Sequence, residues 1–246
     1  ALLAEDFDLW LCDVQGHGDS DHGGRFHGWN RSAELAVEAF DTLRGPFGEV
    51  PRFALGHSFG GVLTSLILAR HPELFRRAVL LDPVLFSPAM IGVMALSDVV
   101  GLAQRTGMAK KAQKRRRQWP DRASAHAALH GRGMFRGWDE AAFDAYIEHA
   151  LKDVEGGVEL KCRPSREADI FGSFPRRLWP SLAKVTTPTE VIHGSRTYPF
   201  VAKSVARWCA SNAHVRSQVV PGGHCFMQEQ PADSAERVTD FLLQRG

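Results

Sequence analysis

Ser58 stands between two glycines, in the order Gly56-His57-Ser58-Phe59-Gly60. The apolar run 53–55 before it is typical of a short buried strand, and apolar residues recur at helical spacing after it. A sharp strand-to-helix turn has no room for side chains beside the serine. We expect Gly56 and Gly60 to leave that space free, so that the serine hydroxyl is exposed. A helix that starts there directs N–H groups toward negative charge formed beside the serine. The segment predicts a nucleophilic Ser58, with the backbone N–H of Phe59 as an oxyanion donor.

A serine hydroxyl is a weak nucleophile until a base takes its proton. Eleven histidines could be that base. His224 is the best placed, because it lies in a glycine turn between the last predicted strand and the last predicted helix. A histidine that only caps the final helix is the alternative. His17 would shape a glycine-rich loop, and His193 ends an apolar run before a glycine, so we interpret both as structural.

The order of these segments resembles the α/β-hydrolase superfamily. The segment around Ser58 is similar to its nucleophile elbow, and His224 matches its catalytic histidine in order and setting. The stretch 13–20, Asp-Val-Gln-Gly-His-Gly-Asp-Ser, is similar to the loop that follows the fourth strand of that fold. The resemblance covers almost the whole chain but only strands four to eight of eight. The loop with the second oxyanion donor would precede Ala1.

The acid of the triad departs from the usual pattern of this family. The acid commonly follows the strand that ends near His193, but residues 195–200 contain no carboxylate. The family's other location is the end of the strand after the elbow helix, where Asp82 stands before Pro83. A carboxylate at a buried strand end needs a partner, which a histidine N–H would provide. We therefore predict that Asp82 is the acid, and the alternative is an aspartate that caps the turn at Pro83.

The resemblance also predicts a slot in the sheet. In the family a third strand lies between the fourth and fifth, which correspond here to segments near Leu9–Asp13 and Phe53–Leu55. Paired strands lie about 4.8 Å apart, so an empty slot would leave two rows of unpaired backbone groups. We expect the chain to be an N-terminal truncation of the native protein, or another of its segments to fill the slot.

Alternating strand and helix patterns predict an α/β fold with a mostly parallel sheet flanked by helices. We expect residues 1–86 and 182–246 to form an α/β-hydrolase core. Residues 87–181 lack strong strand patterns and are rich in bulky apolar side chains, which predicts a helical cap over Ser58. The candidate substrate-binding residues are His57, Phe86 and Met90.

Composition excludes several classes of function. Hydrophobic residues make up 44% of the 246 residues, and the net charge of +2 predicts no strong attraction to nucleic acid. The basic run 110–117 is interpreted as a solvated face, with nucleic acid as the alternative. No apolar run reaches transmembrane length, so no membrane partner is expected. The four cysteines lack metal-ligand spacing, which favours a reduced, cytoplasmic compartment and implies no metal or other cofactor.

These observations predict a serine hydrolase that cleaves a small carboxylic ester or thioester with an apolar portion. An acyl-enzyme would form on Ser58, and water would then attack it and release the acyl group as an acid. A carbon–carbon bond hydrolase that uses the same triad is one alternative. A ligand-binding relative without catalysis is another. The sequence does not determine the oligomeric state.

Overall fold

The computed structural model describes residues 2–47, 49–99 and 107–245. It divides into two compact units. The first contains residues up to 10, 29–91 and those from 175 on, and the second contains 11–28 and 92–174. The unit boundaries at 91 and 175 differ by a few residues from those expected at 86 and 182. The larger difference is the loop 11–28, which we expect in the core but which groups with the second unit.

The first unit is built on a four-stranded parallel sheet in the order β1-β2-β6-β7. The strands are β1 (Phe53–His57), β2 (Arg77–Leu81), β6 (Thr189–Gly194) and β7 (Val215–Val220). Every residue of β6 is buried, as expected for a central parallel strand covered on both faces. This sheet and its flanking helices form the α/β fold that the sequence predicts.

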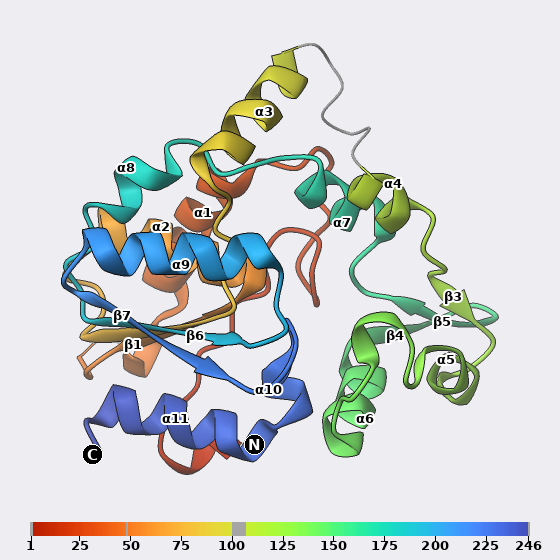
Figure 1. Ribbon diagram of the computed structural model, residues 1–246. Coiled ribbons are helices and arrows are strands. Elements are labelled where there is room, and N and C mark those ends of the chain that lie inside the picture. Colours follow the sequence, from red (N-terminus) through yellow and green to blue (C-terminus); the bar gives the residue numbers. More distant parts are fainter. Residues whose placement is uncertain (1, 48, 100–106, 246) are drawn as a thin grey trace. The chain divides into compact units, whose positions relative to one another are not determined.

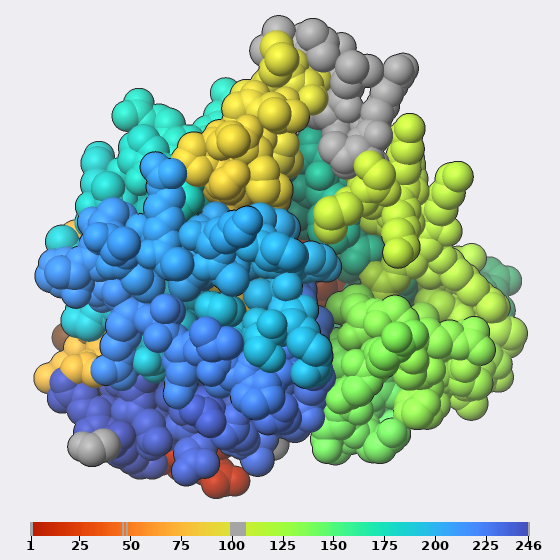
Figure 2. Space-filling model, viewed as in Figure 1, coloured from red at the N-terminus to blue at the C-terminus, as the bar shows by residue number. Residues whose placement is uncertain are grey.

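Helices cover both faces of this sheet (Figure 1). One face carries α1 (Trp29–Leu43), α2 (Ser58–Arg70), α8 (Leu178–Leu182) and α9 (Pro199–Ser211), and the other carries α11 (Pro231–Leu243). In the same view Figure 2 shows α9 and α11 at the surface of this unit, on either side of β7. Apolar residues of α11, among them Val238 and Leu242, pack with Val79 and Ile192 of the strands in one buried cluster. Shorter elements of this unit are η1 (Leu2–Glu5), η2 (Gly45–Phe47) and α10 (Phe226–Glu229).

The segment 7–14, predicted to be a strand, is not a strand in the structure. Its apolar residues do not enter a sheet, and Leu11 is 84% exposed. Within the described residues β1 has β2 as its neighbouring strand and no strand on its other side. A strand forms only where another backbone pairs with its N–H and C=O groups, and no described segment pairs with 7–14. The expected third strand likewise has no counterpart among the described residues.

The second unit combines short helices with a three-stranded antiparallel sheet in the order β3-β5-β4. The strands are β3 (Gln118–Trp119), β4 (Leu151–Val154) and β5 (Gly157–Leu160). The helices are α4 (Gly107–Gln113), α5 (Arg122–Leu129), η4 (Gly133–Phe135), α6 (Glu140–His149) and α7 (Pro164–Phe171), and α3 (Pro88–Val99) crosses the unit boundary. The sequence analysis missed this sheet, because strands of two to four residues carry too few positions for a clear period. The placement of this unit over Ser58 stays a prediction.

A buried arginine explains why the loop 11–28 belongs to the second unit. The Arg166 side chain of α7 is fully buried, and its guanidinium donates to the carbonyls of His22 at 2.6 Å and Gly24 at 2.8 Å. A Cβ atom at Gly16, where φ is +76°, would lie 2.9 Å from Arg166 Nε. The glycine-rich loop is thus shaped around this cation, whose nearest carboxylate belongs to Asp169 at 3.3 Å.

No helix among the described residues is long and apolar enough to cross a membrane.

Candidate active site

The carboxyl ends of the four parallel strands bring the candidate site residues to one edge of the sheet. Ser58 follows β1, Asp82 follows β2, Thr197 comes three residues after β6, and His224 comes four residues after β7. The register pairs His57 with Leu81, so β1 and β2 end level, and it pairs Gly194 with Val220, so β6 and β7 end level. Strand β6 extends two residues beyond Ile192, the partner of Leu81. Parallel topology therefore gathers residues that lie far apart in the sequence.

Ser58 is held in a strained backbone conformation, with φ at +53°. Residues other than glycine seldom adopt this left-handed region, and strain of this kind often occurs at functional sites. A Cβ atom at Gly56 would lie 2.6 Å from the Gly60 carbonyl oxygen, so this position requires glycine. The expectation for Gly60 is wrong, because a Cβ there would meet no atom within 4 Å. Gly61 provides the second close approach instead, since its Cβ would lie 3.0 Å from Pro83.

The structure brings together the side chains of Ser58, His224 and Asp82. His224 Nδ1 lies 2.8 Å from Asp82 Oδ1, and His224 Nε2 lies 2.8 Å from Ser58 Oγ. The carboxylate accepts the Nδ1 proton, which leaves Nε2 of the neutral ring to accept the Ser58 hydroxyl proton. This geometry can activate a serine for attack on a carbonyl carbon. Phe59 follows Ser58 in the first turn of α2, so its N–H points toward the helix start beside Ser58.

Asp82 is completely buried and also has a positive φ, +44°. Its Oδ2 accepts the Gly194 N–H at 2.9 Å, and its Oδ1 accepts a short hydrogen bond from Thr197 Oγ1 in addition to that from His224. Three donors thus compensate the carboxylate for its lost hydration. The sequence analysis noticed that no carboxylate follows β6 but missed the Thr197 hydroxyl. The sequence feature that could have identified Thr197 is a hydroxyl residue in the segment where the family commonly has the acid.

The turn that carries His224 is fixed on both sides. Gly223 donates its N–H to Glu229 Oε1 at 2.9 Å, and a Cβ at Gly222, where φ is +132°, would lie 2.6 Å from Phe226 Cβ. The Tyr198 ring lies 5.1 Å from the His224 ring, and burial raises the pKa of this tyrosine. The His224 ring is therefore positioned by its own turn as well as by Asp82.

His57, a candidate substrate-binding residue, contacts the His224 turn. Its Nε2–H donates to the His224 carbonyl at 3.0 Å, and the two rings lie 4.9 Å apart. Burial and the neighbouring His224 lower the pKa of His57 to about 4. The ring is therefore neutral at pH 7, so it adds no charge that would oppose a proton on His224.

This pKa predicts a loss of stability in mild acid. Unfolded His57 takes up a proton near its ordinary pKa of 6.5, whereas folded His57 resists protonation down to about 4. The unfolded state therefore binds more protons in that window, and the free energy of unfolding falls as the pH is lowered through it. His57 contributes at most about 3 kcal/mol to the free energy of unfolding through this difference in pKa.

His57→Gln tests this dependence, because glutamine can still donate to the His224 carbonyl but does not titrate. Urea unfolding of both proteins at several pH values between 7 and 4 should show a shallower loss in the variant. Other groups titrate alike in the two proteins, so their contribution cancels. Identical slopes in both proteins would contradict the assignment.

Phe86 lies in an aromatic group of the first unit. Phe86 stacks on Phe200 at 5.8 Å and meets the edge of Trp29 at 5.7 Å. Trp29 in turn contacts the Phe59 ring at 4.6 Å, next to the nucleophile position. The sequence analysis missed Phe200. Met90 lies in the first turn of α3, where its N–H donates to Ser87 Oγ at 3.2 Å.

The remaining candidate histidines and the basic run have other partners. The His17 ring contacts the Gln15 carbonyl at 3.3 Å in the second unit, and the buried His193 ring contacts the Gly194 carbonyl at 3.4 Å. In the basic run, Arg115 pairs with Glu167 at 2.8 Å. No three His, Cys, Asp or Glu side chains of the described chain gather as a metal site.

The sequence matches a known family model over most of its length. The model described as "Alpha/beta hydrolase family" matches residues 1–237. The chain belongs to the α/β-hydrolase family. Membership supports hydrolysis as the class of reaction, and the sheet and its helices agree with the family fold.

The chain is similar to two named relatives and to one solved structure. An abhydrolase domain-containing protein of Alternaria alternata, AFT2-1, is 24% identical over 230 residues, which span 78% of this chain and 83% of that protein. The type I acyl-CoA thioesterase mpaH of Penicillium roqueforti is 31% identical over 105 residues, or 42% of this chain and 22% of that protein. The crystal structure of E-2-(acetamidomethylene)succinate hydrolase has a TM-score of 0.75 at 22% identity and covers 93% of this chain and 79% of its own. At this identity the structural match shows the fold alone.

Proposed function

We propose that this hydrolase cleaves a carboxylic ester or thioester through an acyl-enzyme on Ser58. The observation that carries the proposal is the pair of contacts at His224, with Ser58 Oγ on Nε2 and Asp82 on Nδ1, each at 2.8 Å. His224 takes the hydroxyl proton while Ser58 Oγ bonds to the substrate carbonyl carbon. It then gives that proton to the departing alcohol or thiol.

Water completes the cycle by the reverse roles. His224 takes a proton from the water, whose oxygen attacks the acyl carbon, and returns the proton to Ser58 Oγ as the acid product leaves. The backbone N–H of Phe59 stabilises the oxyanion in both steps. Asp82 holds the productive ring tautomer and stabilises the imidazolium.

The proposed substrate has an apolar portion. Phe86, Phe200 and Trp29 form an aromatic group next to Phe59, and such surfaces suit acyl chains and rings. The thioesterase name of one relative supports a thioester as one form of the substrate. We propose the cytoplasm as the compartment, because the four cysteines are free in the structure.

Labelling with a fluorophosphonate probe tests the proposal. The probe phosphonylates an activated serine, so wild-type protein should gain one label, and peptide mapping should find it on Ser58. The variant His224→Ala should lose labelling, because the hydroxyl would no longer have a base. Folded wild-type protein that stays unlabelled would instead favour a ligand-binding relative without catalysis.

A further inference from the structure

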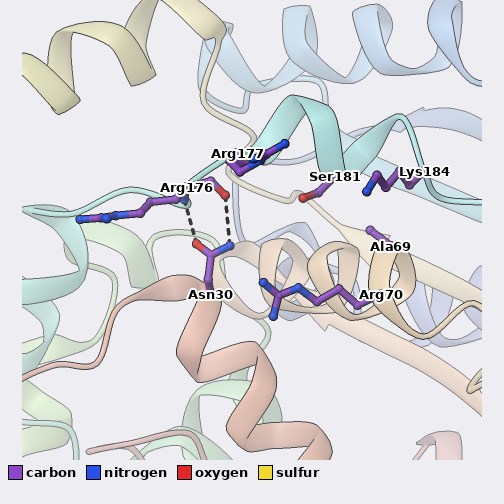
Figure 3. A pocket seen from close by; sticks show the side chains of 7 residues that line it. All are labelled: Asn30, Ala69, Arg70, Arg176, Arg177, Ser181 and Lys184. Atoms are coloured by element: carbon purple, nitrogen blue, oxygen red, sulfur yellow. Dashed lines mark hydrogen bonds between the residues drawn. The ribbon is translucent and has the colours of Figure 1, made fainter.

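A pocket in the first unit combines positive charge with an open cavity of about 350 Å³ (Figure 3). Its residues come from α1, α2, α8 and the segments beside α8, and they are Asn30, Ala69, Arg70, Arg176, Arg177, Ser181 and Lys184. None of them belongs to the proposed triad. This lining has four cationic side chains and no carboxylate, which indicates an anionic ligand.

The charges of the lining are only partly compensated. Arg70 pairs with Glu34 of α1, outside the lining. No carboxylate of a described residue lies within 4.0 Å of the side-chain nitrogens of Arg177 or Lys184. The Arg176 side chain points away from the other lining residues in Figure 3. Arg177 and Lys184 are therefore the two cations available to a ligand.

The backbone that carries Arg177 is held in an unfavourable conformation. Its φ is +56° and its ψ +33°, in the left-handed region where glycine is favoured. The residue before it is clamped by Asn30, whose amide donates to the Arg176 carbonyl at 3.1 Å and accepts the Arg176 N–H at 2.8 Å. Strain at an arginine, supported by a two-bond clamp, favours a role for its side chain.

We propose that this pocket binds the phosphate group of a small phosphate monoester. Two uncompensated cations match the charge of a phosphate monoester, and an arginine fork and the Ser181 hydroxyl can donate to its oxygens. The cavity lies within the range of small-molecule sites and is larger than a phosphate ion needs, so it leaves room for an organic part. Binding here does not depend on the chemistry of Ser58.

Calorimetric titration of the purified protein tests the proposal. The probes are adenosine 5′-monophosphate and glycerol 3-phosphate, with inorganic phosphate, adenosine and glycerol as comparisons at equal ionic strength. Saturable binding of at least one monoester, tighter than that of inorganic phosphate, is expected. No saturable binding of either monoester, or equal binding of inorganic phosphate, would overturn the proposal.

Two variants of Arg177 separate binding from folding. Arg177→Gln should weaken the monoester at least about tenfold, whereas Lys203→Gln, which removes an exposed charge of α9 outside the pocket, should leave its affinity unchanged. Arg177→Gly should also lose binding, yet its melting temperature should equal or exceed that of the wild type, because glycine adopts this φ without strain. Equal losses in Arg177→Gln and Lys203→Gln would show general charge attraction and refute the site. Retained binding in Arg177→Gly would do the same.

Discussion

Replacing Asp82 by asparagine should lower the turnover of an ester by about 10⁴ and leave the fold intact. Turnover should fall because of how the introduced asparagine must orient. The Gly194 N–H is a fixed donor that lies 2.9 Å from Asp82 Oδ2, so an oxygen is required at that position. The amide nitrogen of the introduced asparagine must then take the place of Oδ1, against His224 Nδ1. Two donors cannot face each other, so the ring would carry its proton on Nε2 and could not accept one from Ser58.

Hydrolysis of a p-nitrophenyl acyl ester by the two proteins measures this loss, and circular dichroism checks the fold. Thr197→Val serves as a matched variant, since it removes one donor to Asp82 but keeps the carboxylate and the contact with His224. It should cost far less than Asp82→Asn. Near-native turnover in Asp82→Asn would show that the acid lies elsewhere.

A second change can test the position of the acid. The Thr197 hydroxyl already contacts Asp82 Oδ1, the same oxygen that faces His224 Nδ1. Thr197→Asp added to Asp82→Asn would place a carboxylate after β6, where the family commonly has it. We expect it to recover part of the lost rate if the loop brings that carboxylate to Nδ1.

Replacing Ser58 by alanine should lower turnover at least as much as Asp82→Asn and should abolish fluorophosphonate labelling. The hydroxyl is the proposed nucleophile, and without it His224 has no proton to take. Because the three residues are proposed to act as a unit, the double variant Ser58→Ala with Asp82→Asn should be no slower than Ser58→Ala alone. Multiplying losses in the double variant would contradict a shared role.

Ser58→Gly provides the matched control for folding. The φ of +53° at Ser58 is unfavourable for serine and alanine alike but suits glycine. This variant should therefore unfold at a temperature equal to or above that of the wild type while turnover is lost. A marked fall in its melting temperature would mean that the Ser58 side chain has a structural role.

Local patterns in the sequence were sufficient for the elements that carry the candidate site. The turn at Ser58, the glycine turn at His224 and the end of the strand at Asp82 each have a signal within a few residues, because glycine, proline and apolar periodicity act locally. The parallel sheet follows from the alternation of strands and helices. Parallel strands then place the residues that follow them at one edge.

Features that depend on a distant partner were decided by the tertiary structure alone. The segment 7–14 has the pattern of a strand but no described neighbour to pair with. Arginine is mostly found at protein surfaces, yet the Arg166 side chain is buried. Its guanidinium donates to carbonyls of a loop more than 140 positions earlier in the chain. The Thr197 hydroxyl bonds to Asp82 only because β2 and β6 are adjacent. Such contacts join residues with no sequence pattern in common, and the free energy of burial and pairing appears only when the chain has folded.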